Sequence, residues 1–99
     1  MAGPQARDLV LITIDTLRAD RLGAYGYGRA RTPHIAGLAA RGARFAHAFA
    51  AAPITLPSHA TMLTGLFPPR HGVRDNGTFS LPPAVESVAE RFSAAGRDT

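Results

Sequence analysis

The chain of 99 residues contains no cysteine, no tryptophan and no lysine. Without cysteine it forms no disulfide and no cysteine-ligated zinc site, which excludes a cross-linked small scaffold and a zinc finger. The same absence leaves the cellular compartment open. All 11 basic residues are arginine. Together with the abundant alanine and glycine, this usage indicates a GC-rich coding sequence. Such a bias is genomic and gives no information about the mechanism.

Long hydrophobic runs are also missing. The apolar segment Leu9–Ile14 is too short for the core of a signal peptide, and no small-residue cleavage site follows it. No segment has the length of a transmembrane helix. The sequence therefore predicts no membrane segment in this chain and, by default, a cytoplasmic location.

The net charge is +4, with a high isoelectric point. The arginines are dispersed from Arg7 to Arg97, and no basic helix or aromatic stacking platform accompanies them. This pattern predicts no nucleic-acid partner. The positive charge instead suits the attraction of a small anionic ester, while the oligomeric state stays open.

One carboxylate stands out by its position after an apolar segment. Leu9–Ile14 is nearly all apolar and rich in branched residues, which predicts a strand buried on both faces of a parallel sheet. Asp15 then follows the carboxyl end of that strand. Ligands bind at this edge of open α/β sheets, so Asp15 is placed as a metal ligand or catalytic carboxylate. The alternative is that Asp15 caps the short turn over residues 16–21.

The rest of the chain alternates between helical and strand patterns. Thr32 with Pro33 gives a helix start and Gly42 a stop, and the residues after Gly42 alternate as in a strand. The predicted elements are a strand at Leu9–Ile14, a helix at Thr32–Arg41, a strand at Arg44–Phe49, and helices at Pro57–Thr64 and Pro83–Ala95. This alternation predicts an α/β fold with a parallel sheet.

The segment from Thr55 to Gly65 places a hydroxyl beside the N-terminus of a helix. Pro57 suits the first helical turn and Gly65 suits the residue after the last turn. The first N–H groups of such a helix lack partners and carry the positive end of its dipole, so an oxyanion can dock there. The alternative is an ordinary cap, in which Thr55 or Ser58 serves only the helix.

Four segments, in this order, resemble the N-terminal part of the sulfatases in the alkaline phosphatase superfamily: Ile14–Tyr27, Thr32–Ala39, Thr55–Gly65 and His71–Gly77. The resemblance implies a partial alkaline-phosphatase-like sandwich, with a mostly parallel sheet flanked by helices. That family needs several hundred residues to complete its sheet and metal site. We therefore expect residues 1–99 to be one incomplete N-terminal domain fragment, inactive in isolation.

The resemblance also implies metal-dependent hydrolysis of sulfate or phosphate esters. Thr55 takes the nucleophile position, and Asp15 and Thr55 are the expected ligands of a divalent cation: calcium, magnesium, manganese or zinc. Thr16 stands where many sulfatases have a second aspartate ligand. In sulfatases proper the nucleophile is a cysteine or serine oxidised to formylglycine. Threonine carries a methyl group on Cβ and would give a ketone, so no formylglycine is expected.

Three further residues follow from the same resemblance. His59 replaces the arginine of the sulfatase motif, lies one helical turn after Thr55, and is expected to donate a proton or a hydrogen bond. Asn76, expected to be both catalytic and substrate-binding, resembles an asparagine that binds a phosphoryl oxygen in threonine-using relatives. Arg74 is expected to bind the anionic substrate. The alternatives are that His59 is a structural histidine, that Asn76 only belongs to a turn at Asp75–Gly77, and that Arg74 is only solvated.

Three functions remain open on the sequence. The first is a hydrolase of sulfate or phosphate esters, similar in its threonine to nucleotide pyrophosphatase/phosphodiesterases. The second is an envelope transferase of phosphoglycerol or phosphoethanolamine type with the same fold. The third is a non-catalytic truncated remnant.

Overall fold

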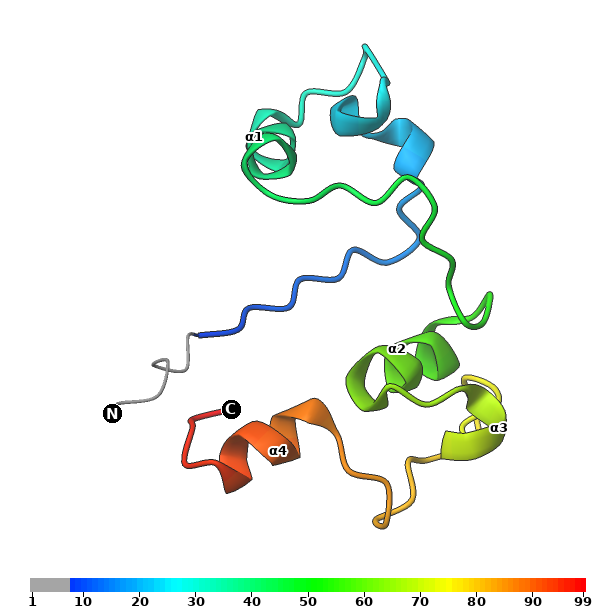
Figure 1. Cartoon of the computed structure of the whole chain (residues 1–99). Coiled ribbons are helices and arrows are strands. Elements are labelled where there is room, and N and C mark those ends of the chain that lie inside the picture. The colour runs from blue at the N-terminus through cyan, green and yellow to red at the C-terminus, as the bar shows by residue number, and fades with distance from the viewer. Residues whose placement is uncertain (1–7) are drawn as a thin grey trace. The chain divides into compact units, whose positions relative to one another are not determined.

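The computed structural model describes residues 8–99, and its helices are labelled in Figure 1. The chain divides into two compact units, Met1–Phe45 and Ala46–Thr99. Over the described residues all regular secondary structure is helical. None of the helices in this part of the chain is long and apolar enough to cross a membrane.

The predicted strand at Leu9–Ile14 is not formed in the described residues. This segment carries no regular secondary structure, and Val10 and Ile12 are 78% and 77% exposed. The predicted strand at Arg44–Phe49 is also absent, with Phe49 89% exposed. A strand needs a neighbour to bond its N–H and C=O groups, and residues 8–99 provide none. The parallel sheet therefore stays unconfirmed, while the exposed apolar side chains are of the kind that a sheet would bury.

The first unit turns sharply after its extended segment. The Leu17 N–H donates to the Ile14 carbonyl at 3.4 Å, which closes a turn over Asp15 and Thr16. Thr16 has φ of 58°, a left-handed conformation that is unusual for a β-branched residue and costs on the order of 1–3 kcal/mol. Its hydroxyl donates to the Asp15 carbonyl at 2.7 Å. Asp15 thus lies within a backbone turn.

Three helices complete the first unit: the short 3-10 helices η1 (Ala19–Arg21) and η2 (Gly23–Tyr25), and α1 (Pro33–Arg41). The predicted helix at Thr32–Arg41 is confirmed, because Pro33 opens α1 and the Gly42 N–H closes it on the Leu38 carbonyl. Helices α1 and η2 are in contact.

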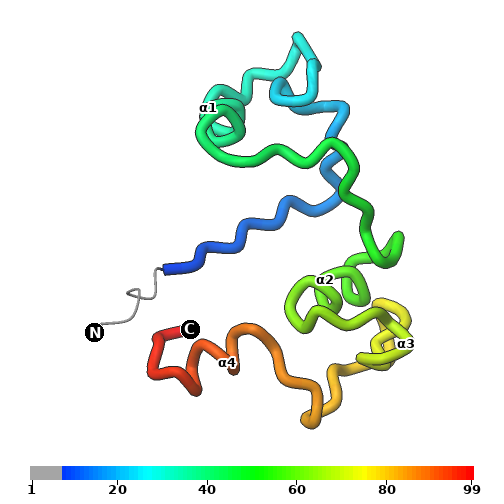
Figure 2. Tube along the Cα trace, in the orientation of Figure 1, coloured from blue at the N-terminus to red at the C-terminus, as the bar shows by residue number. Residues whose placement is uncertain are grey.

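The second unit is built on α2 (Thr55–Thr64), α3 (Pro68–His71) and α4 (Val88–Ala94), and Figure 2 follows the chain through them. Helix α2 ends as predicted, since Gly65 adopts the left-handed conformation with φ of 71°. It begins two residues earlier than predicted. Pro57 accordingly lies third in the helix, still within the first turn, where its missing N–H has no helical partner to lose.

Helix α3 lies in a region predicted to be a loop. Pro68 and Pro69 fix φ at values that suit a first helical turn, and Gly72 ends the helix in the left-handed conformation with φ of 80°. The core of the second unit lies in α2 and the segment around α3, where four residues are buried: Pro57, Ala60, His71 and Val73. Helices α2 and α3 are in contact.

Helix α4 starts later than the predicted Pro83–Ala95. Ser87 and Glu90 form a reciprocal capping box, in which the Glu90 N–H donates to the Ser87 hydroxyl at 3.3 Å and the Ser87 N–H donates to the Glu90 carboxylate at 2.7 Å. The residues before Ser87 are excluded from the helix because this box satisfies its first donors.

This capping box makes α4 sensitive to acid. The hydrogen bonds from the Ser87 backbone and side chain lower the pKa of Glu90 below its ordinary value of 4.5. A carboxyl whose folded pKa is lowered stabilises the folded form above its unfolded pKa, and this contribution is lost as pH falls through the folded pKa. We expect α4 to fray below pH 4.5. Amide chemical shifts of α4 followed against pH measure this, and Glu90→Gln removes the transition, whereas Asp98→Asn outside the helix retains it.

Candidate functional site

Thr55 is the first residue of α2 in the structure. The N-cap residue is Ile54, in an extended conformation with φ of −127°, so neither Thr55 nor Ser58 takes the capping position. The alternative in which one of these hydroxyls serves only as the helix cap is therefore not met. Thr55 therefore lies at the end of α2 that carries the positive pole of the helix dipole.

Asn76 lies at the same helix end. Its Oδ1 accepts a hydrogen bond from the Leu56 N–H at 2.8 Å, although the two residues are 20 positions apart in the sequence. Because Leu56 donates, the bonded atom is the carbonyl oxygen of the carboxamide, and the amide NH2 group is directed elsewhere. The structure thus brings the Asn76 carboxamide to the residue that follows Thr55.

The predicted turn around Asn76 forms as well. Asp75 Oδ1 accepts from the Gly77 N–H at 2.9 Å and from the Thr78 N–H at 3.4 Å. This side-chain turn satisfies the local backbone without using the Asn76 carboxamide. The turn therefore forms without the Asn76 side chain, and the expected binding role of Asn76 stays a prediction.

His59 is tied to Thr55 through the backbone. Its Nδ1 lies 2.9 Å from the Thr55 carbonyl oxygen. A carbonyl only accepts, so Nδ1 carries a proton in this contact. The contact orients the imidazole along the first turn of α2, as the four-residue spacing predicts.

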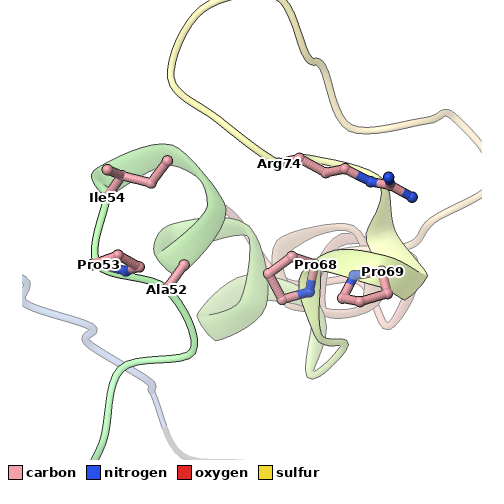
Figure 3. A pocket seen from close by; sticks show the side chains of 6 residues that line it. All are labelled: Ala52, Pro53, Ile54, Pro68, Pro69 and Arg74. Atoms are coloured by element: carbon pink, nitrogen blue, oxygen red, sulfur yellow. The ribbon is translucent and has the colours of Figure 1, made fainter.

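Arg74 borders an apolar cavity of about 510 Å³. The other lining residues come from the segment before α2 and from α3: Ala52, Pro53, Ile54, Pro68 and Pro69. Figure 3 shows Arg74 near Pro68 and Pro69, with Pro53 and Ile54 across the opening. Because Ile54 directly precedes Thr55, the cavity adjoins the N-terminus of α2, and Arg74 supplies its positive charge.

Asp15 belongs to the first unit, whereas Thr55, His59, Arg74 and Asn76 belong to the second. Near Asp15 in the sequence, Arg18 pairs with Asp20 through hydrogen bonds of 2.9 and 2.6 Å. This pairing lowers the pKa of Asp20. In the part of the chain that the structure describes, no group of three or more His, Cys, Asp or Glu side chains is placed to hold a metal ion.

Sequence reasoning assigns no role to His71, which is fully buried between α2 and the loop after α3. Its two ring nitrogens both have partners, Thr61 and Val73. The signal that would have found it is the proline pair followed by Gly72, which predicts a short helix ending at His71. A histidine at the end of such a helix lies where it can bond to a neighbouring element.

A hydroxyl at a helix N-terminus, a carboxamide beside it and a nearby arginine form a site suited to an oxyanion.

The sulfatase family profile matches residues 7–99. The chain is 36% identical to mouse (Mus musculus) steryl-sulfatase over 99% of its own length, and 43% identical to rat (Rattus norvegicus) steryl-sulfatase over 93%. It is 33% identical to an arylsulfatase of Clostridium perfringens over 93% of its length. No solved structure gives a significant match.

The chain belongs to the sulfatase family. Membership implies the alkaline-phosphatase-like fold, of which residues 8–99 show helical parts only. The chain spans 18% of the length of the two steryl-sulfatases and 19% of the arylsulfatase.

Proposed function

We propose that this segment carries the nucleophile of a metal-dependent hydrolase of sulfate or phosphate esters, with Thr55 as the attacking residue. The observation that carries the proposal is the hydrogen bond from the Leu56 N–H to Asn76, which joins the start of α2 to the loop at Asn76. A tetrahedral oxyanion held there would meet the positive end of the α2 dipole and a carboxamide donor together. The relatives named sulfatases support the reaction class.

The proposed reaction has two displacements. The Thr55 hydroxyl gives up its proton as its oxygen forms a bond to sulfur or phosphorus; the bond to the ester oxygen breaks, and the departing alcohol oxygen takes up a proton. Water then gives up a proton as it attacks the same sulfur or phosphorus, and the released Thr55 oxygen takes up a proton. The Asn76 NH2 group donates to a non-bridging oxygen, Arg74 binds the anion, and the His59 ring supplies a proton.

The implied divalent cation fits the donors present only in part. The Asp15 carboxylate and the Thr55 hydroxyl are oxygen donors of the kind that calcium, magnesium and manganese accept, and zinc also accepts carboxylates. Two donors are fewer than the four or more such ions usually take, so further ligands would come from elsewhere in the protein. When bound, the cation would make the hydroxyl nucleophilic at neutral pH. No formylglycine is involved in the proposal.

A substrate panel tests the proposal on the full protein that contains this segment. We expect a chelator to abolish hydrolysis and one of calcium, magnesium, manganese or zinc to restore it. The panel comprises an aryl sulfate, a phosphate monoester and a phosphodiester. Hydrolysis of any of them supports the proposal. Transfer to an added alcohol without hydrolysis would identify the envelope-type transferase instead, and no turnover with no metal bound would identify a non-catalytic remnant.

Phosphodiesters are a second candidate substrate class beside sulfate esters. The favouring observation is the threonine at position 55 together with Asn76, whose Oδ1 is bonded to Leu56 and whose amide NH2 group suits a phosphoryl oxygen. A higher kcat/KM for the diester than for the aryl sulfate supports this candidate, and the reverse order supports a sulfatase that uses threonine.

A further inference from the structure

We propose that His71 is a positioning residue, which acts through Thr61 to hold the loop of residues 72–76 along α2 and so fixes Asn76 beside Thr55. The inference rests on the proposed function, because it assigns His71 a part in presenting Asn76 to the oxyanion. His71 itself touches neither Thr55 nor Asn76 through a hydrogen bond among the described residues.

The hydrogen bonds of His71 determine where its proton lies. The Val73 N–H donates to Nδ1 at 3.1 Å, so Nδ1 is the unprotonated nitrogen. Nε2 then carries the proton and donates to the Thr61 hydroxyl at 3.0 Å. Both nitrogens are used and the side chain has 0% exposure, so the ring cannot reach a substrate. Its part in the reaction must be exerted through the residues it holds.

The loop after α3 is attached to α2 at two points. One is the bond between His71 and Thr61, and the other is the bond between Asn76 and Leu56. Asn76 follows His71 by five positions and Thr61 follows Leu56 by five, so the loop runs back along the helix toward its N-terminus. Five residues of helix rise about 7.5 Å.

The stretch between the two attachments is packed. Val73 is 1% exposed, and Pro57 and Ala60 on α2 are buried as well. A buried side chain midway along the loop resists lateral movement, because interiors are close-packed and a shift would open a void. The two hydrogen bonds set the register of the loop, and the buried valine keeps it against the helix.

Register matters because Asn76 acts by position. A donor placed for a developing charge loses much of its effect when it moves by about 1 Å, without any change in the donor itself. Release of the His71 attachment removes one of the contacts that hold this loop on α2 and leaves Asn76 held through its bond to Leu56 and the packing of Val73. The carboxamide then samples positions away from the site of Thr55.

A double-mutant cycle between Thr61 and Asn76 in the full protein containing this segment tests the inference. Thr61→Val removes the hydroxyl that His71 bonds and keeps the side-chain shape, while Thr61→Ser keeps the hydroxyl and is the matched control. We expect Thr61→Val to lower kcat roughly tenfold with little change in KM, and Thr61→Ser to stay within about twofold of wild type. In an Asn76→Ala background, Thr61→Val should have almost no further effect.

Amide exchange gives a second readout that does not depend on catalysis. Thr61→Val should speed exchange at the Leu56 amide, which bonds to Asn76, while the Gly65 amide, which bonds to the Thr61 carbonyl, stays protected. Equal acceleration at both amides would mean that the helix itself is weakened, and it would overturn the inference.

The cycle also separates this inference from the proposed function. If Thr61→Val lowers kcat equally with Asn76 present and absent, His71 does not act through Asn76 and the inference fails while the proposed function stands. If Thr55→Ala leaves hydrolysis unchanged, the proposed function fails whatever the cycle shows.

Discussion

Replacement of Thr55 by alanine is expected to abolish ester hydrolysis by the full protein containing this segment, with kcat lowered by at least ~10³-fold. The substitution removes the only protein atom that the proposed mechanism bonds to sulfur or phosphorus. Alanine suits the first position of α2, where Thr55 lies outside the N-cap, so the helix should persist. The loss then reports on chemistry and not on folding.

Thr55→Ser is the matched control for this prediction. Serine keeps the attacking oxygen and removes only the methyl group, so we expect activity within roughly tenfold of wild type. Measurement of kcat and of substrate-dependent labelling of residue 55 checks both variants. A wild-type rate in Thr55→Ala would contradict the assignment of the nucleophile, as would a serine variant that is as inactive as alanine.

Helix ends were predictable where one residue dictates the backbone. Gly65 adopts φ of 71°, which a glycine reaches without steric cost, and Pro33 opens α1. The start of α2 was not predictable by the same reasoning. The Leu56 N–H donates to the side chain of Asn76, which lies 20 positions later in the sequence. A contact over this separation leaves no local pattern in the sequence.

The other differences have separate physical causes. Helix α3 has four residues, too few for apolar periodicity to reveal it. The start of α4 was readable, because Ser87 followed by Glu90 three residues later is a capping-box pattern, although the predicted helix Pro83–Ala95 began earlier. The strands at Leu9–Ile14 and Arg44–Phe49 depend on partner strands, which the sequence of one segment cannot specify.

In the candidate site, too, local features were predictable and long-range contacts were not. The spacing of Thr55 and His59, one helical turn apart, is a local property, and the structure shows the contact from the His59 ring to the Thr55 carbonyl. The approach of Asn76 to α2 is a tertiary property that the family resemblance suggested and local patterns could not. The proline pair before His71 and Gly72 after it indicate a short helix, but they do not show that the histidine is buried, which depends on the packing of α2 against α3.

His71→Leu is expected to cause the largest loss of stability of any single substitution in the second unit. The change leaves two partners without their hydrogen bonds: the Val73 N–H, which is buried, and the Thr61 hydroxyl, which is partly buried. An unsatisfied buried polar group costs about 1–3 kcal/mol, so the expected decrease in the free energy of unfolding is about 2–5 kcal/mol. Burial of the leucine side chain offsets only part of it.

The amide analogues of histidine dissect this loss. Asn places its Oδ1 near the position of Nδ1 and can still accept from the Val73 N–H two residues on, as in an Asx turn, whereas Gln extends a donor toward Thr61. We expect His71→Asn and His71→Gln each to recover part of the unfolding free energy lost in His71→Leu. Urea titration of the full protein, with amide exchange in α2 and α3 reporting the second unit, measures the series. Equal stability of the leucine variant and wild type would show that packing alone holds α3 to α2, because the two hydrogen bonds would then contribute nothing measurable to the folded state.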